Sequence, residues 1–267
     1  MRRLMGEPRA EQRRQSALLD MLSDRFDAAI YDELIAASGA MVDHFELTGE
    51  VPVDPQHIDR LREIYLAMAD ASIGTFASRV MQAALRKSAG YHIEGKTFLL
   101  SGPDSVFEVK DFASTLRDWA RAYVEGEAIR RRIVEVTDTT RNLIIRAVAR
   151  GFEDGLGQRG VAEYVRSLVP SLSRARSALI ARTETHGAAQ HGAQQAAAET
   201  GLKLRREWIS AEDHRTRLSH ALANEQVVGM DEPFIVGGVE LAMPGDPSGP
   251  ADQVINCRCV VGYIVDE

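Results

Sequence analysis

Residues 173–201 read SRARSALIARTETHGAAQHGAQQAAAETG, and they mark where the chain changes from helical to mixed structure. Alanine crowds the second half of this stretch and Gly201 ends it, so the pattern predicts a long helix from about Ser173 to Glu199. Its small side chains let neighbouring elements approach closely. After Leu202 the helical spacing of apolar residues is lost, and Trp, Pro and Gly become more frequent. The sequence therefore predicts a mainly α protein with a C-terminal α+β module.

Toward the N-terminus, apolar residues recur at helical spacing. Residues 9–38 predict an amphipathic helix with Gly39 as its stop, and residues 57–90 predict a second long helix that ends at Gly90. The stretch LTGEVPVDPQ between them contains Gly and two prolines, which indicates an exposed linker. Residues 96–109 contain two β-prone runs around Ser-Gly-Pro-Asp and predict a short hairpin.

Further helices are expected before residue 173. One covers 111–136, with Asp111 as its N-cap, and another begins at Thr137 or Asp138. A short helix should end at Pro170, since proline lacks the backbone N–H that continues a helix. Together these long N-terminal helices precede a compact helical and small-sheet domain.

Three short stretches of the C-terminal third are typical of strands. They are KLRREWI (203–209), PFIVGGVELAMPG (233–245) and CRCVVGYIV (257–265). The middle stretch reads as a hairpin that turns at its paired glycines, Gly237 and Gly238.

Composition indicates an ordinary soluble protein, since 45% of the 267 residues are hydrophobic and 27% are charged. No window approaches 18 consecutive apolar residues and the first residues lack an apolar core, so we expect neither a membrane span nor a secretory signal. Two cysteines cannot make a disulfide framework, and reduced thiols in the cytosol are expected.

The charge is unevenly distributed. The net charge is −7, yet residues 130–182 hold eleven arginines against five acids and so carry +6, which leaves −13 for the remainder. A basic segment of an acidic protein could face DNA or an acidic protein surface. The alternative is that the arginines lie on solvated helix faces. The candidates for facing DNA are Arg130, Arg131, Arg132, Arg141 and Arg146.

The densest polar clusters lie at 207–226 and near the C-terminus. Cys257 and Cys259 would share one face of an extended segment, with Arg258 pointing away, so both sulfurs could reach one ion. His220 is the best third ligand, and Asp213 or His214 is the fourth. Histidine, carboxylate and thiolate are the groups that hold Zn²⁺ at four-coordinate sites.

Two other interpretations of this cluster stay open. The cysteines could pack as small apolar residues while the histidines make ordinary hydrogen bonds. The cluster could also be catalytic, either with Cys257 as nucleophile and His220 as base, or as a metal-dependent, nuclease-like hydrolase that uses Asp213, His220, Cys257 and Cys259. The chain contains no HExxH, P-loop or GxSxG signature that would support catalysis.

The stretch ARTETHGAAQHG (181–192) places polar residues in the middle of the alanine-rich helix. Arg182 and His186 are four residues apart, as are His186 and Gln190, so they share a helix face. We expect a buried polar spine that contacts the C-terminal sheet, with a solvated helix face as the alternative.

Taken in order, these blocks resemble the phage Mu F-like head-morphogenesis family of tailed bacteriophages. The resemblance covers about residues 137–267 and rests on an ARTE helix, a Trp followed by D-x-R-T-R-x-x-H, a Phe before a Gly-rich turn, P-G-D-P, and a terminal N-C-R-C. The matching positions are Arg182, Thr183, Glu184, Trp208, Asp213, Arg215, Thr216, Arg217, His220, Pro244, Gly245, Asp246, Asn256, Cys257, Arg258 and Cys259.

The resemblance implies a minor head protein of a phage, prophage or gene transfer particle, present in few copies. It further implies association with the portal protein and other head proteins during procapsid assembly in the bacterial cytoplasm, and then a place at the portal vertex of the virion head. No catalytic role, membrane or small-molecule substrate is expected. Packaged DNA is a further possible partner.

The expected domain organisation follows from the extent of the resemblance. Residues 1–136 would form a helical region that docks on portal or scaffold, and residues 137–267 would form the head-morphogenesis domain. Related modules occur joined to toxins, but the chain contains no obvious extra catalytic domain that would make it an effector carrier.

Overall fold

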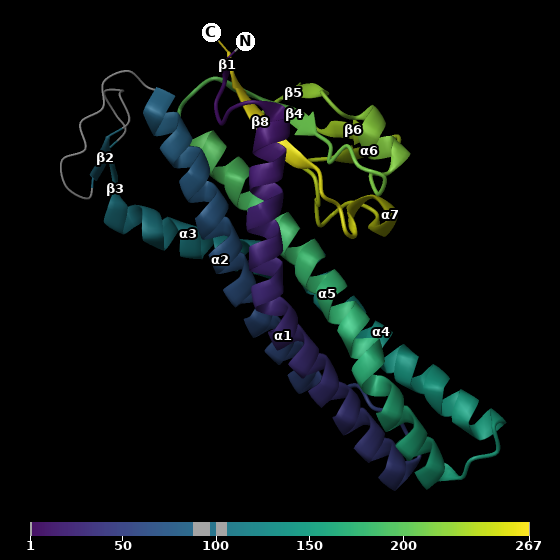
Figure 1. The fold of residues 1–267 in the computed structure, drawn as a ribbon. Helices are drawn as coiled ribbons and strands as arrows, with labels where there is room; N and C mark the ends of the chain where they lie inside the picture. Colours follow the sequence, from purple (N-terminus) through teal and green to yellow (C-terminus); the bar gives the residue numbers. More distant parts are fainter. Residues whose placement is uncertain (1, 88–96, 100–105, 267) are drawn as a thin grey trace. The chain divides into compact units, whose positions relative to one another are not determined.

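The computed structural model describes residues 2–87, 97–99 and 106–266. It is mainly helical, with small antiparallel sheets, which confirms the predicted fold class (Figure 1). The helices are α1 (Pro8–Thr48), α2 (Pro55–Lys87), α3 (Val109–Glu125), α4 (Glu127–Glu153), α5 (Gln158–Glu199), α6 (Leu218–Leu222) and α7 (Ala251–Val254). None of these helices is apolar enough over sufficient length to cross a membrane.

The strands are short and all pair antiparallel. β1 (Arg2–Arg3), β8 (Val260–Val265), β4 (Leu204–Ile209) and β5 (Val227–Gly229) form one sheet in that order. β2 (Thr97–Leu99) pairs with β3 (Val106–Glu108), and β6 (Phe234–Val236) pairs with β7 (Val239–Leu241). Both expected hairpins are thus confirmed. The turn of the first one lies outside the described residues.

The chain forms two compact units, and each is built from segments that are far apart in sequence. The first compact unit contains Met1–Leu22, Met68–Tyr123 and Arg182–Glu267, and the second contains Ser23–Ala67 and Val124–Ala181. The expected division at residue 136 into a docking region and a head-morphogenesis domain stays a prediction.

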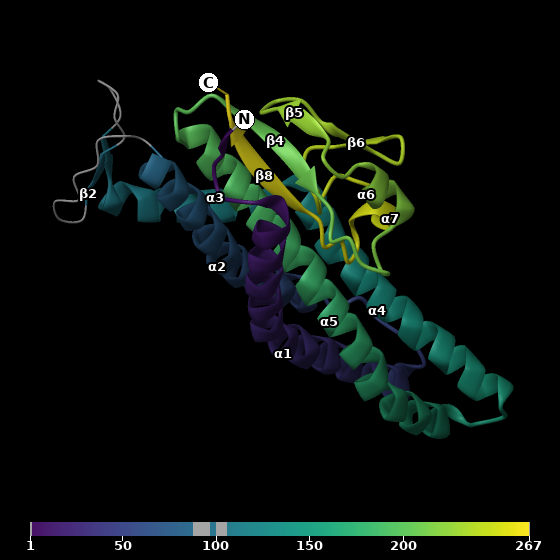
Figure 2. The ribbon, with the colours of Figure 1, turned by 45° about the horizontal axis from the view of Figure 1, so that its top comes forward.

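In the first compact unit, the four-stranded sheet packs on helices. β8 lies beside β4, as both ribbon views show (Figure 2). The two strands pair along their whole length, with Arg206 opposite Tyr263. Alanines of α5 share one apolar core with β4, β8 and both cysteines. At Gly192 of α5, an added Cβ would lie 2.6 Å from the Ile73 Cα of α2, so only glycine permits this approach. The small side chains of residues 173–201 therefore allow α5 to pack closely on its neighbours.

In the second compact unit, parts of α1, α4 and α5 enclose an apolar core that includes Met41, Phe45, Ile144 and Val165. Charged side chains join these helices at the surface, as where Arg166 contacts Asp43 and Glu46. Buried residues recur at helical spacing along each helix, because each helix packs against the others with one face.

Several predicted helix ends were wrong. α1 continues through Gly39 because Ala37 and Met41 on either side of it are buried, and it ends at Thr48 before Gly49, which has φ +80°. α5 likewise runs through Pro170, which is exposed on a helix whose Val165 and Val169 are buried. In both cases the burial of an apolar face outweighs a local helix breaker.

The remaining differences concern helix starts. α3 begins at Val109, so Asp111 lies inside the helix and does not cap it. α4 passes through Thr137 and Asp138, because the Thr137 hydroxyl donates to the Ile133 carbonyl (3.1 Å) and so is satisfied within the helix. The end predicted at Gly90 lies outside the described residues; α2 is described to Lys87.

Candidate metal centre

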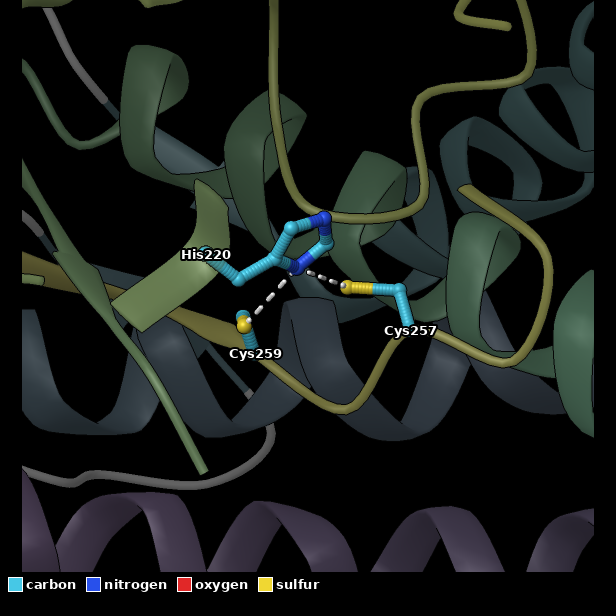
Figure 3. Close-up of side chains that lie close together, drawn as sticks. All are labelled: His220, Cys257 and Cys259. Atoms are coloured by element: carbon cyan, nitrogen blue, oxygen red, sulfur yellow. Dashed lines mark hydrogen bonds between the residues drawn. The ribbon is translucent and has the colours of Figure 1, made fainter. Parts of the chain in front are cut away.

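His220, Cys257 and Cys259 form a buried cluster in the first compact unit. Their ligand atoms all lie within 4.8 Å of one another. The His220 Nδ1 atom lies 3.3 Å from Cys259 Sγ and 3.6 Å from Cys257 Sγ. Figure 3 shows both sulfurs pointing at this nitrogen, while the second ring nitrogen points away from them. The structure thus brings together three of the four residues predicted from sequence to bind metal.

The segment after β4 positions His220. The Asp213 carboxylate accepts a hydrogen bond from the Arg215 backbone N–H (2.9 Å), which closes a tight turn just before α6. α6 is only five residues long, and His220 lies in its middle. The edge of the imidazole meets the Trp208 ring of β4 at 83° and 5.5 Å between centroids. The Trp208 contact therefore fixes which way the imidazole faces.

The cysteines lie just before the last strand. We expected them inside a strand, but β8 begins only at Val260, because Asn256 takes a left-handed conformation (φ +58°) after α7. The Asn256 N–H donates to Thr183 Oγ1 (3.0 Å). On the other side of the pair, His186 Nε2 lies 2.8 Å from the Cys259 carbonyl oxygen. α5 therefore holds the cysteine segment from both ends.

The two thiols differ in acidity. Burial would raise the pKa of Cys257, but hydrogen bonds from Cys259 and His220 outweigh it and hold that pKa well below its usual value. The pKa of Cys259 is well above its usual value, because its thiol donates to Cys257 and is buried. One sulfur is therefore readily a thiolate, the form that binds metal.

The donor set fits a thiophilic ion. Two sulfurs and one imidazole nitrogen are ligands that Zn²⁺ accepts, whereas Mg²⁺ requires oxygen. Because the three ligand atoms lie within 4.8 Å of one another, one ion can be shared among them. The described residues thus contain a possible metal-binding group of three protein ligands.

Asp213 lies beside this cluster and has another partner. Both of its carboxylate oxygens accept hydrogen bonds from the Arg258 guanidinium. The same guanidinium holds the pKa of Asp213 below its usual value. The partner of Arg258 is thus the expected fourth ligand, Asp213. His214 is exposed. Their roles as ligands stay predictions.

A family model described as phage Mu protein F like protein matches residues 142–262. This part of the chain is similar to phage Mu protein F like proteins. The match confirms the resemblance read from the motif blocks, and the family indicates a phage head-morphogenesis protein.

One curated relative is an NAD(+)–arginine ADP-ribosyltransferase from Enterococcus faecalis. It is 25% identical to this chain over 148 residues, which cover 54% of this chain and 30% of the relative. The chain thus matches less than a third of that protein's length. No solved structure matches the chain.

Other motif residues of the matched part of the chain surround the cluster. Arg182 donates to Asn256 Oδ1 (3.2 Å), and Arg217 donates to the Ile255 carbonyl (2.6 Å). Asp246 is buried and accepts hydrogen bonds from the Ala242 and Ser248 backbone N–H groups (2.8 and 2.9 Å). Glu184 is also buried. Most of the motif therefore ties loops to α5 and to the cysteine segment.

The predicted polar spine of α5 is confirmed. Gln190 accepts from the Val261 N–H (3.1 Å) and donates to Gln15 (3.1 Å), while His186 reaches Cys259. The sequence reasoning missed Arg206, whose buried guanidinium contacts three backbone carbonyls. The only signal for it in the sequence was its inward position on a strand. A charged side chain buried at such a position needs hydrogen-bond partners.

The arginines proposed to face DNA lie on α4, in the second compact unit. Arg130, Arg131 and Arg146 are exposed, and Arg131 pairs with Glu135 on its own helix. Arg141 donates to the Val51 carbonyl (2.9 Å). Arg132 is half-buried. Both earlier interpretations, solvated faces and a DNA surface, remain predictions.

Proposed function

We propose that this protein is a minor head protein of a phage, prophage or gene transfer particle that associates with the portal and takes part in procapsid assembly. The observation that carries the proposal is the family match over residues 142–262. Residues 1–136 would dock on portal or scaffold, and the protein would end in the virion head.

Particle composition tests this proposal. Deletion of the gene should yield particles that lack the protein and show reduced assembly or DNA content, and complementation should restore them. Mass spectrometry of purified wild-type particles should detect the chain in few copies per portal. Its absence from both procapsids and mature particles would overturn the proposal.

We further propose that the buried cluster holds a structural zinc ion. His220 comes from α6, and the two sulfurs come from a segment 37 residues further along the chain, so one ion would join two segments that also contact each other through Arg258 and Asp213. Zinc bound by thiolates and imidazole supplies folding free energy directly.

Metal content tests the zinc proposal. Purified wild-type protein should contain about one zinc per chain by elemental analysis, and Cys257→Ser should lose it. His191→Gln, which changes a histidine of the same compact unit outside the cluster, should retain the metal. Metal-free wild-type protein, refolded with added zinc and still unable to bind it, would refute the proposal.

The cluster supports a structural role better than hydrolysis. Asp213 is held by Arg258, and the three candidate ligands are each at most 2% exposed, which leaves a large substrate little access to them. The ADP-ribosyltransferase activity in the relative's name belongs to a protein more than three times the matched length. If His220→Asn lowers the melting temperature and metal content together, the role is structural; an unchanged melting curve with loss of a nuclease activity would favour the enzyme.

We also propose that the arginines of α4 contact packaged DNA. A charge-reversed variant with Arg130, Arg131 and Arg146 changed to Glu should lose binding to duplex DNA in a mobility-shift assay at low salt. No binding by the wild-type protein at low salt would remove this part of the proposal.

A further inference from the structure

α6 presents two exposed leucines to solvent while its other side holds the cluster. Leu218 is 75% exposed and Leu222 is 78% exposed. Among the large apolar side chains of the described residues, only Leu47 is exposed to a similar degree. The two leucines are four residues apart and so share a helix face, whereas His220 is buried on the inner side. Such a pair on a short helix is typical of an interaction surface.

Neighbouring contacts fix what lies beside these leucines. Ser219 donates to Gln253 of α7 (2.9 Å), and α6 and α7 lie side by side in both ribbon views (Figures 1 and 2). Arg217 donates to the Ile255 carbonyl, which places Ile255 next to the start of α6; Ile255 is itself 37% exposed. A partly exposed apolar residue of the segment after α7 therefore lies close to the start of α6.

Positive charge borders this apolar surface. Arg215 and Arg217 lie just before α6, and the Arg215 side chain is exposed. Arginines also predominate over acids nearby: Arg182, Arg215, Arg217 and Arg258 against Glu212, Asp213 and Asp252, with Asp213 paired to Arg258 and Glu212 paired to Arg9. On a chain with net charge −7, this is a local reversal of sign.

A small cavity lies among these arginines. It is lined in part by Arg215, Arg217, Asn256 and His220, and its volume of about 10 Å³ accommodates one water-sized sphere. His220 is 2% exposed, and its Nε2 atom has no hydrogen-bond partner within the described part of the chain.

We propose that this α6 surface, formed by Leu218, Leu222, Ile255, Arg215 and Arg217, binds an acidic segment of another protein of the particle that carries apolar anchor residues. The inference rests on the proposed function only in taking the partner from the particle. Charge complementarity selects the acidic character, and the adjacent leucines select a protein over nucleic acid, because DNA phosphates offer exposed leucines no apolar partner. The motif arginines Arg215 and Arg217 thereby gain a role in recognition.

Site-specific photo-crosslinking in particle-producing cells tests this proposal. p-Benzoylphenylalanine is placed at position 218 of the full chain, or at exposed position 156, outside residues 1–136, as the control. After irradiation of purified procapsids, position 218 should crosslink to a peptide rich in Asp and Glu, identified by mass spectrometry, at a yield about tenfold above position 156. A crosslink to a basic or uncharged peptide, to DNA, or to nothing at all overturns the inference.

Variants separate this surface from the proposed function. Arg215→Glu and the double variant Leu218→Ser/Leu222→Ser should each lower the amount of protein in particles about tenfold, while Leu156→Ser, at an exposed leucine outside residues 1–136, should leave it unchanged. Circular dichroism and zinc content of each purified variant establish that it is folded. If the wild-type protein never enters particles, the proposed function fails; if both variants enter normally, only the surface is wrong.

Discussion

At the scale of single residues, the buried Arg206 stabilises the first compact unit through its guanidinium group. It donates to the carbonyls of Gly229 (3.2 Å), Glu232 and Ala242 (2.5 Å), and it lies over the Phe234 ring at 5.2 Å. One side chain therefore joins β4 to two loops and to the hairpin of β6 and β7.

Replacing Arg206 by Met should lower the free energy of unfolding by about 2–4 kcal/mol, since three buried carbonyls lose their donor. Urea denaturation followed by circular dichroism measures the change. The control is Arg205→Met on the same strand, whose exposed guanidinium pairs with Asp266 and whose loss should cost about 1 kcal/mol or less. Equal losses in the two variants would contradict the structural role of Arg206.

A second residue-scale prediction concerns His191. Burial lowers the pKa of His191, and the nearby Asp246 opposes this shift only in part. The unfolded chain therefore binds this proton at higher pH than the folded chain, so the stabilisation is complete above the unfolded pKa of about 6.5 and is lost as pH falls below it. Between pH 7.5 and 5.5, wild-type protein should lose more unfolding free energy than His191→Gln. A parallel loss in both proteins would contradict this prediction.

The sequence predicted the cluster better than it predicted the surroundings. Residue types that bind zinc pointed to His220 and the cysteines, and the structure brings these three together. Asp213 was expected beside them as a metal ligand, because its carboxylate and its spacing suit one. Neither property reveals that a cationic side chain already pairs with this carboxylate. That cation is Arg258, which lies between the two cysteines and reaches Asp213 only because the chain turns at Asn256.

At the scale of elements, the close approach of α2 and α5 within the first compact unit depends on glycine. Gly192→Ala would place a Cβ 2.6 Å from the Ile73 Cα and 2.9 Å from its carbonyl oxygen, both of them backbone atoms that cannot rotate away. We expect a loss of about 2–3 kcal/mol in unfolding free energy, measured by thermal or urea denaturation.

Gly39→Ala is the matched change on α1. No atom lies within 4 Å of the added Cβ, and Gly39 is inside a helix, so alanine should stabilise the protein by about 0.5–1 kcal/mol. Gly192→Ala without a loss of stability would mean that the helices do not approach as described, and a loss in Gly39→Ala would mean that residue 39 lacks the open space described.

Most elements could be predicted from sequence, but their ends often could not. Helical spacing and turn glycines located α1, α2, α5 and the hairpin at Gly237 and Gly238, which have φ +61° and +82°. The helix breakers Gly39 and Pro170 led to wrong predictions of helix ends. Each costs a few kcal/mol of helix stability at most, whereas the flanking turns bury apolar faces whose partners lie far away in sequence. Such partners are invisible to a local pattern.

At the scale of the whole molecule, the candidate ion belongs to only one of the two compact units. A zinc chelator should therefore accelerate amide hydrogen exchange by about tenfold or more in α6 and in residues 255–261, while the buried face of α4 stays protected. Exchange measured by mass spectrometry with and without chelator checks this. No change in α6, or an equal change in α4, would contradict a local effect of the metal.

The order of strands also bears on biosynthesis. β8 is the last strand of the described chain, yet it pairs with both β1 and β4, and the segment that precedes it carries both sulfurs. A nascent chain that has not released Val260–Val265 from the ribosome leaves β1 without a partner and the α6 surface without support. Prematurely terminated products therefore lack the surface inferred to recruit the protein, so incorporation into particles would itself discriminate against incomplete copies.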